Sequence, residues 1–152
     1  MSTIRPVKPE EAEILSQIAI TAKRHWNYPE QWMKLWIPQL RFGPAYFEAN
    51  ESWAAESADH TVIAFYTLQD RDGIAWLENI WVLPEYMGQG IGKDLFTDAL
   101  SRARALGYKI LRLEAEPNAI GFYEKMGMRK VGEYEYELDG QPRILPIMEI
   151  DL

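Results

Sequence analysis

Apolar residues recur three or four positions apart in two long stretches of the chain, 9–23 and 91–106. In the first stretch Pro9 occupies the first helical position, which proline favours, and after the second stretch Gly107 supplies a helix stop. Two shorter stretches have the same spacing: 32–37, which is interrupted by Pro38, and 119–126, which is ended by Gly127. The periodicity therefore predicts four helices.

Strand-forming residues are concentrated between these helical stretches. They make up seven runs: 3–8, 52–57, 61–69, 74–83, 109–115, 129–138 and 143–150. Turn-forming residues separate the second, third and fourth runs, and Asp139-Gly140 separates the last two, so both groups are predicted to be antiparallel. The order of the elements predicts a single α/β domain over residues 1–152, with a mixed sheet of about six to seven strands flanked by about four helices.

The composition is typical of a globular domain and excludes several classes of protein. Of the 152 residues, 47% are hydrophobic and 26% are charged, and no apolar run is long enough to cross a bilayer. Acidic residues outnumber basic ones by 23 to 16, which argues against nonspecific nucleic-acid binding and slightly favours a cationic substrate. We therefore expect neither a nucleic-acid partner nor a membrane partner.

The chain contains no cysteine, which removes disulfides and thiolate nucleophiles together. Its first residues lack the apolar segment of a signal peptide, so a cytoplasmic location is expected. The two histidines, His25 and His60, are far apart and have no cysteine beside them, which matches none of the familiar metal-ligand spacings. We expect no metal.

Three glycines stand where the fourth strand run has ended and the longest helix begins: Gly88, Gly90 and Gly92. Without side chains at these positions, backbone N–H groups can point at an anion where the helix begins, which makes the loop a candidate phosphate site. The spacing does not fit a P-loop, because Met87 stands where its first glycine belongs and Asp94 replaces its hydroxyl residue, and it does not fit a dinucleotide fingerprint. A glycine-rich connection without a ligand is the alternative interpretation.

The loop, the strand before it and an aromatic segment after it resemble the GNAT superfamily of N-acetyltransferases, and the resemblance covers nearly the whole chain. Its most specific parts are Leu77-Glu78-Asn79-Ile80-Trp81-Val82-Leu83-Pro84, Gly88-Gln89-Gly90-Ile91-Gly92, Pro117-Asn118-Ala119 and Phe122-Tyr123-Glu124-Lys125-Met126-Gly127. Ordered motifs at matching separation are much harder to obtain by chance than one motif. The resemblance implies a GNAT-like fold and an N-acetyltransferase that uses acetyl-CoA as co-substrate.

The resemblance also implies how acetyl-CoA is bound. In this family the loop backbone holds the pyrophosphate, a role that falls here to Met87, Gly88, Gln89, Gly90, Ile91, Gly92 and Lys93. The family usually has Arg or Gln where this chain has Met87. This departure leaves open a side-chain contact to phosphate, which Gln89 or Lys93 could partly replace, and does not affect the backbone contacts. On the strand before the loop, the backbone amides around Ile80, Trp81 and Val82 are expected to pair with the pantetheine arm and polarise the thioester carbonyl.

Tyr123 matches the tyrosine that protonates the leaving thiolate of coenzyme A in many relatives. A phenol with a pKa of about 10 is protonated at neutral pH, and the thiolate of a thiol with a pKa of about 8.5 can accept its proton. The alternative is that Tyr123 only packs with Phe122 in the core. The resemblance also allows Asn118 to contact the pantetheine arm, although its position at the start of a helix suits an N-cap equally well.

Glu78 is the candidate general base, acting directly or through a water molecule. Alternation along the strand puts it on the same face as Trp76, Ile80 and Val82, where partial burial would favour proton acceptance. A bulge would break this alternation, and a simple ion pair with a nearby cation is the other interpretation of Glu78.

The segment between the first two helices commonly lines the acceptor site in the family. Here it contains His25, Trp26 and Tyr28, which together with Glu78 form the predicted acceptor-binding set. Polar tips on His25 and Tyr28 suit a wet cleft, whereas Trp26 fits a core position equally well.

The predicted function is transfer of an acetyl group from acetyl-CoA to a primary amine of a small molecule or peptide. Without cysteine no thiol can carry the acetyl group, so direct attack by the amine is expected. The alternative is a non-catalytic acyl-CoA sensor on the same fold. Exposed strand edges are compatible with a homodimer, but nothing in the residues requires one.

Overall fold

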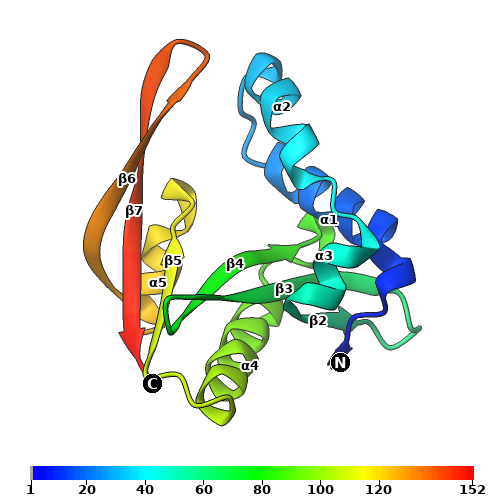
Figure 1. Ribbon diagram of the computed structural model, residues 1–152. Coiled ribbons are helices and arrows are strands. Elements are labelled where there is room, and N and C mark those ends of the chain that lie inside the picture. Colours follow the sequence, from blue (N-terminus) through cyan, green and yellow to red (C-terminus); the bar gives the residue numbers. More distant parts are fainter. Residues whose placement is uncertain (1) are drawn as a thin grey trace.

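The computed structural model describes residues 2–152, which form a seven-stranded mixed sheet covered by helices (Figure 1). The strands are β1 (Thr3–Pro6), β2 (Glu51–Glu56), β3 (Val62–Arg71), β4 (Ile74–Val82), β5 (Ile110–Glu114), β6 (Arg129–Leu138) and β7 (Gln141–Asp151). The helices are α1 (Ala12–Arg24), α2 (Glu30–Trp36), α3 (Pro44–Ala49), α4 (Ile91–Ala105) and α5 (Ile120–Lys125). The sheet order is β1-β2-β3-β4-β5-β7-β6.

This architecture confirms the predicted α/β fold with its mixed sheet, and differs from the prediction in the helices. The prediction of four helices lacks α3, a six-residue helix that begins at Pro44 and buries Phe47. Pro9 opens a short 3-10 turn, and α1 begins only at Ala12. Pro38 lies in a second 3-10 turn directly after α2, which agrees with the predicted interruption of this helical stretch.

Each face of the sheet has its own apolar core. On one face α4 and α5 cover the sheet, with Leu95 and Phe96 fully buried against it. On the other face α1, α2 and α3 pack on Phe65, also fully buried, together with Leu15 and Met33. The strands that carry the site therefore lie between two packed layers of helices.

Strands β4 and β5 separate along their length, and this separation positions the site. They are the parallel pair of the sheet, and their register comprises only Ala75 with Leu111 and Trp76 with Arg112. The glycine loop follows the carboxyl end of β4, and the segment leading to α5 follows that of β5. Ligands of α/β sheets commonly bind at such carboxyl ends, so the two predicted motifs meet at one opening.

A bulge in the β3–β4 pairing corrects the predicted face of Glu78. The register changes from Thr67 opposite Asn79 to Leu68 opposite Leu77, which leaves Glu78 as the extra residue. Ile80 therefore shares the α4 face with Leu77 and not with Glu78. The expectation that Glu78 lies on the same face as Ile80 and Val82 is wrong, because strict alternation does not continue through a bulge.

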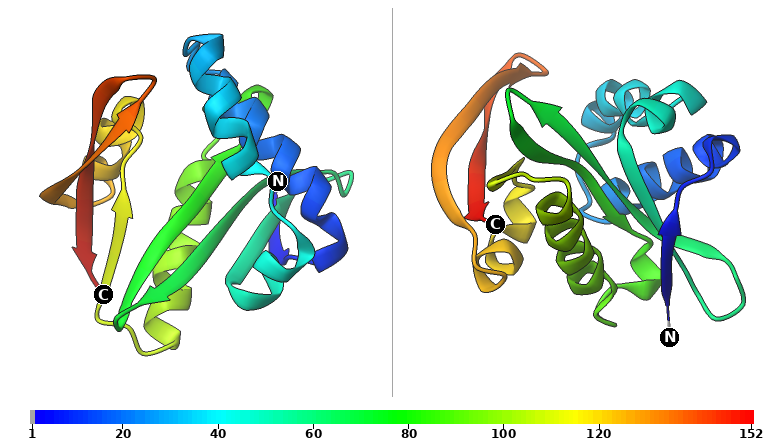
Figure 2. Two further views of the ribbon diagram at one scale, coloured as in Figure 1. Left: turned by 45° about the horizontal axis from the view of Figure 1, so that its top comes forward. Right: turned by 60° about the horizontal axis from the view of Figure 1, so that its bottom comes forward.

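The last two strands form a long hairpin that extends beyond β5. Asp139 and Gly140, both with positive φ, make the predicted two-residue turn. Figures 1 and 2 show this hairpin as an arm that faces α1 and α2 across the carboxyl ends of β4 and β5. Within residues 2–152, no helix combines the length and apolar character that crossing a bilayer requires.

Candidate functional site

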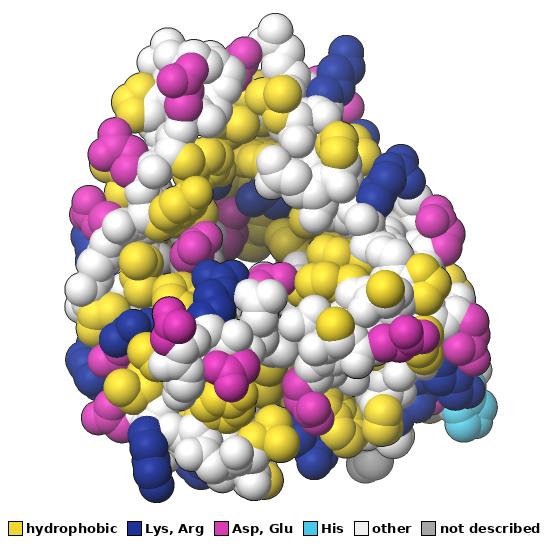
Figure 3. Space-filling model, viewed as in Figure 1, with side chains coloured by type: hydrophobic (Ala, Val, Ile, Leu, Met, Phe, Trp, Pro, Cys, Tyr) yellow, Lys and Arg dark blue, Asp and Glu magenta, His cyan; other side chains and the backbone are white. Residues whose placement is uncertain are grey.

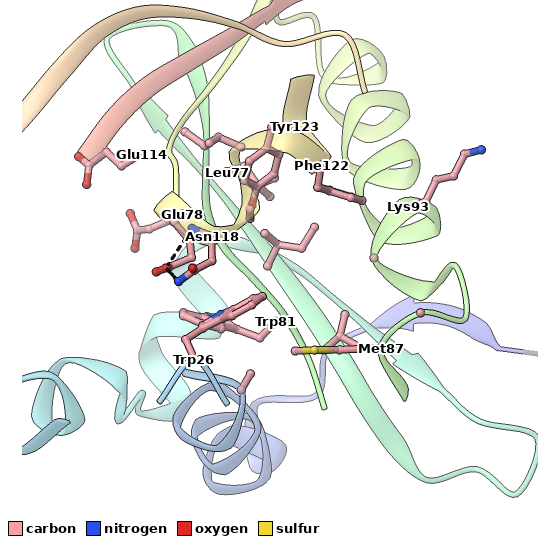
Figure 4. Close-up of a pocket in the computed structure, with 18 of the residues that line it drawn as sticks. Trp26, Leu77, Glu78, Trp81, Met87, Lys93, Glu114, Asn118, Phe122 and Tyr123 are labelled. Atoms are coloured by element: carbon pink, nitrogen blue, oxygen red, sulfur yellow. Dashed lines mark hydrogen bonds between the residues drawn. The ribbon is translucent and has the colours of Figure 1, made fainter. Parts of the chain in front are cut away.

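A cavity of about 510 Å³ opens where β4 and β5 separate (Figure 4). Its walls come from β4, the glycine loop, the end of β5 and α5, with Trp26 contributed by the segment after α1. Leu77, Ile80, Val82 and Phe122 make much of the wall apolar. The cavity thus runs between the two motifs that define the sequence resemblance.

The glycine loop places free backbone N–H groups at the start of α4. Gly88 and Gly90 have φ of 80° and 82°, a conformation that side chains other than glycine rarely adopt. The first helical hydrogen bond runs from the N–H of Asp94 to the carbonyl of Gly90 at 3.0 Å. Because that bond is the first, the N–H groups of the three preceding helical residues have no acceptor within the helix. This arrangement fits a phosphate group at a positive helix end.

Not every predicted loop residue borders the cavity. Met87 and Lys93 line it together with the three glycines, but Figure 4 shows the ammonium end of Lys93 pointing away from its centre. Ile91, the first residue of α4, is buried in the core, and Gln89 is exposed; neither lines the cavity. Gln89 therefore does not line the cavity, and the charged end of Lys93 does not point to its centre, so the structure gives neither side chain the place expected of a substitute for Arg or Gln at position 87.

Tyr123 lies on α5 and points into the cavity (Figure 4). Its side chain is only 6% exposed and packs against Phe122 and Phe96, with ring centroids 5.3 and 6.0 Å apart. Burial, with a smaller contribution from the negative charge of Glu116, raises the pKa of Tyr123 above its ordinary value. The phenol is therefore both a core residue and a protonated group at the cavity wall.

Glu78 lines the same cavity and is held by two partners. Its Oε1 accepts a hydrogen bond of 2.5 Å from the hydroxyl of Tyr46, and its Oε2 accepts one of 3.0 Å from Arg71. The carboxylate therefore forms the ion pair that the sequence analysis left open. Since a carboxylate has about four lone-pair sites, these two bonds leave room for another donor.

Asn118 lies in a 3-10 turn, Pro117–Ala119, and lines the cavity. Its amide donates to Glu116 Oε1 at 2.8 Å and to the hydroxyl of Tyr28 at 3.1 Å. The residue that caps this turn is Glu116, whose carboxylate accepts from the N–H of Asn118. The alternative role of Asn118 as an N-cap is therefore wrong.

Glu116 is a cavity residue that the sequence analysis missed. It forms an ion pair of 3.1 Å with Lys23 and accepts a hydrogen bond from Tyr28. Burial acts to raise the pKa of Glu116, but the charge of Lys23 and the hydrogen bonds outweigh it, so the pKa is lowered. Its one sequence signal is its position directly before Pro117-Asn118, at the edge of the second motif.

The predicted acceptor-binding residues are only partly brought together. Trp26 and Glu78 both line the cavity, whereas Tyr28 does not line it and is linked to it by its hydrogen bond to Glu116. Burial and the bond to Glu116 raise the pKa of Tyr28 to about 12, so it acts as a donor at neutral pH. His25 is exposed, stacks edge-on against Trp26 at 5.2 Å, and does not line the cavity.

The residues that the structure describes include no group of three or more His, Cys, Asp or Glu placed to hold a metal ion. The polar groups that line the cavity include the phenol of Tyr123 and the carboxylates of Glu78, Glu114 and Glu116.

The parallel pair of β4 and β5 opens onto the glycine loop and the start of α4, which is the arrangement that the sequence resemblance predicted. Residues 13–128 match the model of the Acetyltransferase (GNAT) family. Because this match covers most of the chain, the protein belongs to the GNAT acetyltransferase family, as the resemblance in the sequence indicated.

Individual relatives and solved structures agree with the family. The chain is 31% identical over 90 residues to peptidyl-lysine N-acetyltransferase YjaB of Salmonella typhimurium, a match covering 59% of this chain and 58% of that protein. It spans about half the length of the curated relatives that it matches.

Two crystal structures share the whole fold. The GCN5-related N-acetyltransferase from Rhodopseudomonas palustris has a TM-score of 0.84 at 23% identity, covering 100% of this chain and 96% of that one. The PaiA N-acetyltransferase from Thermoplasma acidophilum, in complex with coenzyme A, has a TM-score of 0.80 at 24% identity, covering 100% and 99%. At these identities the likeness establishes the common fold.

Proposed function

We propose that this protein transfers an acetyl group from acetyl-CoA to a primary amine, and that the amine attacks the thioester directly. One observation carries the proposal. The free N–H groups of the glycine loop and the buried phenol of Tyr123 border the same cavity, at the carboxyl ends of two separating strands. A phosphate cradle and a proton donor are the two groups that a coenzyme A thioester needs at its ends.

The apolar walls of the cavity suit the pantetheine arm between these ends. Ile80, Trp81 and Val82 line it along β4, where the strand has lost its partner β5 and its backbone groups are free to pair with the arm. In this proposal an amide of β4 polarises the thioester carbonyl, as preorganised donors do in other acyl transfers.

Two protons must move in the reaction. The amine nitrogen forms a bond to the carbonyl carbon, the carbon–sulfur bond breaks, and the leaving thiolate takes the proton of Tyr123. The attacking amine loses a proton to Glu78, directly or through water, and the carboxylate has room for it beside Tyr46 and Arg71. Because the chain contains no cysteine, no thiol-bound acyl-enzyme is part of the scheme.

The test is to measure acetylated amine and free coenzyme A thiol for wild type and Tyr123→Phe over a broad panel of amines. We expect Tyr123→Phe to lower kcat by about 10²-fold or more, while the Kd for coenzyme A changes little, since the phenol acts on the departing thiolate. Phe122→Leu serves as a control for altered packing in the same wall. Binding of acetyl-CoA without acetylation of any amine would instead support the non-catalytic sensor.

A further inference from the structure

Four side chains from distant parts of the chain converge beside the cavity, between α1, α2 and the hairpin. They are Lys23 at the end of α1, Tyr28 before α2, Glu116 after β5, and Arg143 on β7, and we call them the cationic corner. Arg143 donates to the hydroxyl of Tyr28 at 3.3 Å and lies 3.8 Å from Glu116. The sequence analysis pointed only to Tyr28.

The corner holds two positive charges and one negative charge. Lys23 and Arg143 form ion pairs only with Glu116 among the residues that the structure describes. The side chains of Lys23 and Arg143 are only 13% and 11% exposed, and Nε of Arg143 is buried without a hydrogen-bond acceptor in the described chain. One carboxylate therefore faces two buried cations that lack a second anion.

Aromatic rings compensate these cations only in part. The ring of Trp36 lies 4.1 Å from Nζ of Lys23 and 5.0 Å from the guanidinium carbon of Arg143. Tyr28 contacts both cations as well, and Trp32 contacts Arg143, but a ring neutralises no charge as a second anion would. Burial, with a smaller contribution from the charge of Arg143, lowers the pKa of Lys23, so holding this charge inside the protein has a cost. A second anion would relieve this cost, whereas another cation would add to it.

The corner is continuous with the proposed reaction site. Glu116 and Asn118, which are hydrogen-bonded to each other, both line the cavity. Figure 3 shows a hollow between the hairpin and α2 with basic and acidic side chains at its floor. An acceptor that presents its amine near Tyr123 can therefore direct a second group toward the cations.

We propose that the cationic corner binds an anionic group, a carboxylate or a phosphate, carried by the acceptor amine. The inference rests on the proposed acetyl transfer and names the class of its acceptor: a primary amine with an anionic substituent. Arg143 is suited to bidentate recognition of either anion, and Lys23 adds a second charge. The slight preference for cationic substrates suggested by the net charge of the chain does not apply at this corner.

The experiment compares matched amines that differ only in the anionic group. One arm uses ω-amino carboxylates of increasing length, from glycine to 6-aminohexanoate, against alkylamines of the same length. The other arm uses O-phosphoethanolamine against ethanolamine. Steady-state release of coenzyme A thiol gives kcat and KM for each pair, and the two arms distinguish a carboxylate from a phosphate.

Arg143→Gln and Lys23→Met are measured beside Arg24→Gln, which removes a positive charge from an exposed ion pair with Glu30 on the same side of the molecule. For the preferred anionic amine, each corner variant should raise KM about tenfold or more with a small change in kcat. The Kd for coenzyme A, measured by calorimetry, should equal that of the wild type. An unchanged Kd also establishes that the variants are folded. Arg24→Gln should behave as wild type.

Glu116→Gln gives a test in the opposite direction. It removes the anion that competes for both cations, so the KM for the anionic amine should fall. Equal kcat/KM for anionic and neutral amines, with no effect of Arg143→Gln or Lys23→Met, would show that the corner does not bind the acceptor. The proposed acetyl transfer would be unaffected by that result. If the protein binds coenzyme A but acetylates no amine, both the proposed acetyl transfer and the proposed anion-binding role of the corner are wrong.

Discussion

The hydroxyl of Tyr46 donates a hydrogen bond of 2.5 Å to Glu78, 32 residues further along the chain. The same hydroxyl accepts a bond of 2.9 Å from the amide of Asn79 and lies 3.1 Å from the hydroxyl of Thr67. Thr67 and Asn79 are buried. Tyr46 therefore anchors α3 to the β3–β4 bulge and fixes the carboxylate at the cavity wall.

Removing this hydroxyl should destabilise the protein. Tyr46→Phe leaves the buried Thr67 and Asn79 with fewer partners, so we expect the free energy of unfolding in urea to fall by about 1–2 kcal/mol. Tyr134→Phe is the matched control, because Tyr134 is exposed on the hairpin, and it should change stability by less than about 0.5 kcal/mol. Equal stability of the two variants would show that the network contributes little.

Glu78→Gln should impair acetyl transfer without loss of cofactor binding. The amide keeps the shape of the side chain but accepts a proton poorly, so kcat should fall by about 10²-fold or more. Glu114→Gln removes a carboxylate from the wall of the same cavity and is the control. If both variants keep the wild-type kcat, Glu78 is not the base, and the proton of the amine is taken up by solvent water.

Gly90→Ala should weaken acetyl-CoA binding. A side chain at this position would meet no protein atom within 4 Å, but the backbone has φ of 82°, which costs alanine about 1–2 kcal/mol. Gly43→Ala is the control: it adds the same methyl group in equally open space, but at a negative φ of −92°, where alanine causes no backbone strain. We expect calorimetry to give a raised Kd for coenzyme A in Gly90→Ala alone, and a raised Kd in both variants would exclude strain in the loop as the cause.

The N-terminal ion pair should make stability depend on pH in the acid range. Glu11 accepts two hydrogen bonds from Arg5, 2.9 and 2.6 Å long, and these are the main cause of its lowered pKa. Because the unfolded carboxyl takes up a proton first as the pH falls, the stabilisation from Glu11 is complete above its ordinary pKa of 4.5 and is lost as the pH falls through its folded pKa.

Glu11→Gln should therefore lower the free energy of unfolding by about 1–3 kcal/mol at pH 7, and the difference from wild type should shrink below pH 4.5. Glu10→Gln, at an exposed neighbouring position, is the control. Denaturant unfolding at pH 7, 5 and 3 measures the difference. A constant difference at all three values would contradict a role for the Glu11 charge.

Local patterns were sufficient for the strands, the long helices and the two motifs, because each depends on residues close together in the sequence. The α4 helix and its glycine loop are an example, since periodicity and the three glycines lie within one continuous segment. The sequence of β4 alone does not predict the bulge at Glu78, because the bulge depends on how β4 pairs with β3. The predicted face of Glu78 failed for that reason.

The missed parts of the site depend on distant contacts. Lys23 and Glu116 are 93 residues apart, and Arg143 is 115 residues from Tyr28, so only folding of the hairpin against α1 and α2 brings the corner together. Helix α3 has six residues, too few for a periodic pattern, yet it supplies Tyr46. Sequence patterns thus located the glycine-loop side of the cavity better than the side near Lys23 and Glu116.

The most direct test of the proposed cofactor site is a titration of the ¹⁵N-labelled protein with coenzyme A, followed by backbone amide NMR. The N–H groups of Gly88, Gly90 and Gly92 should show the largest shifts, with smaller changes along β4 from Ile80 to Val82, while the amide of Gly140 at the hairpin turn stays in place. Binding of coenzyme A that leaves the loop amides unshifted would contradict the phosphate cradle on which the proposed acetyl transfer depends.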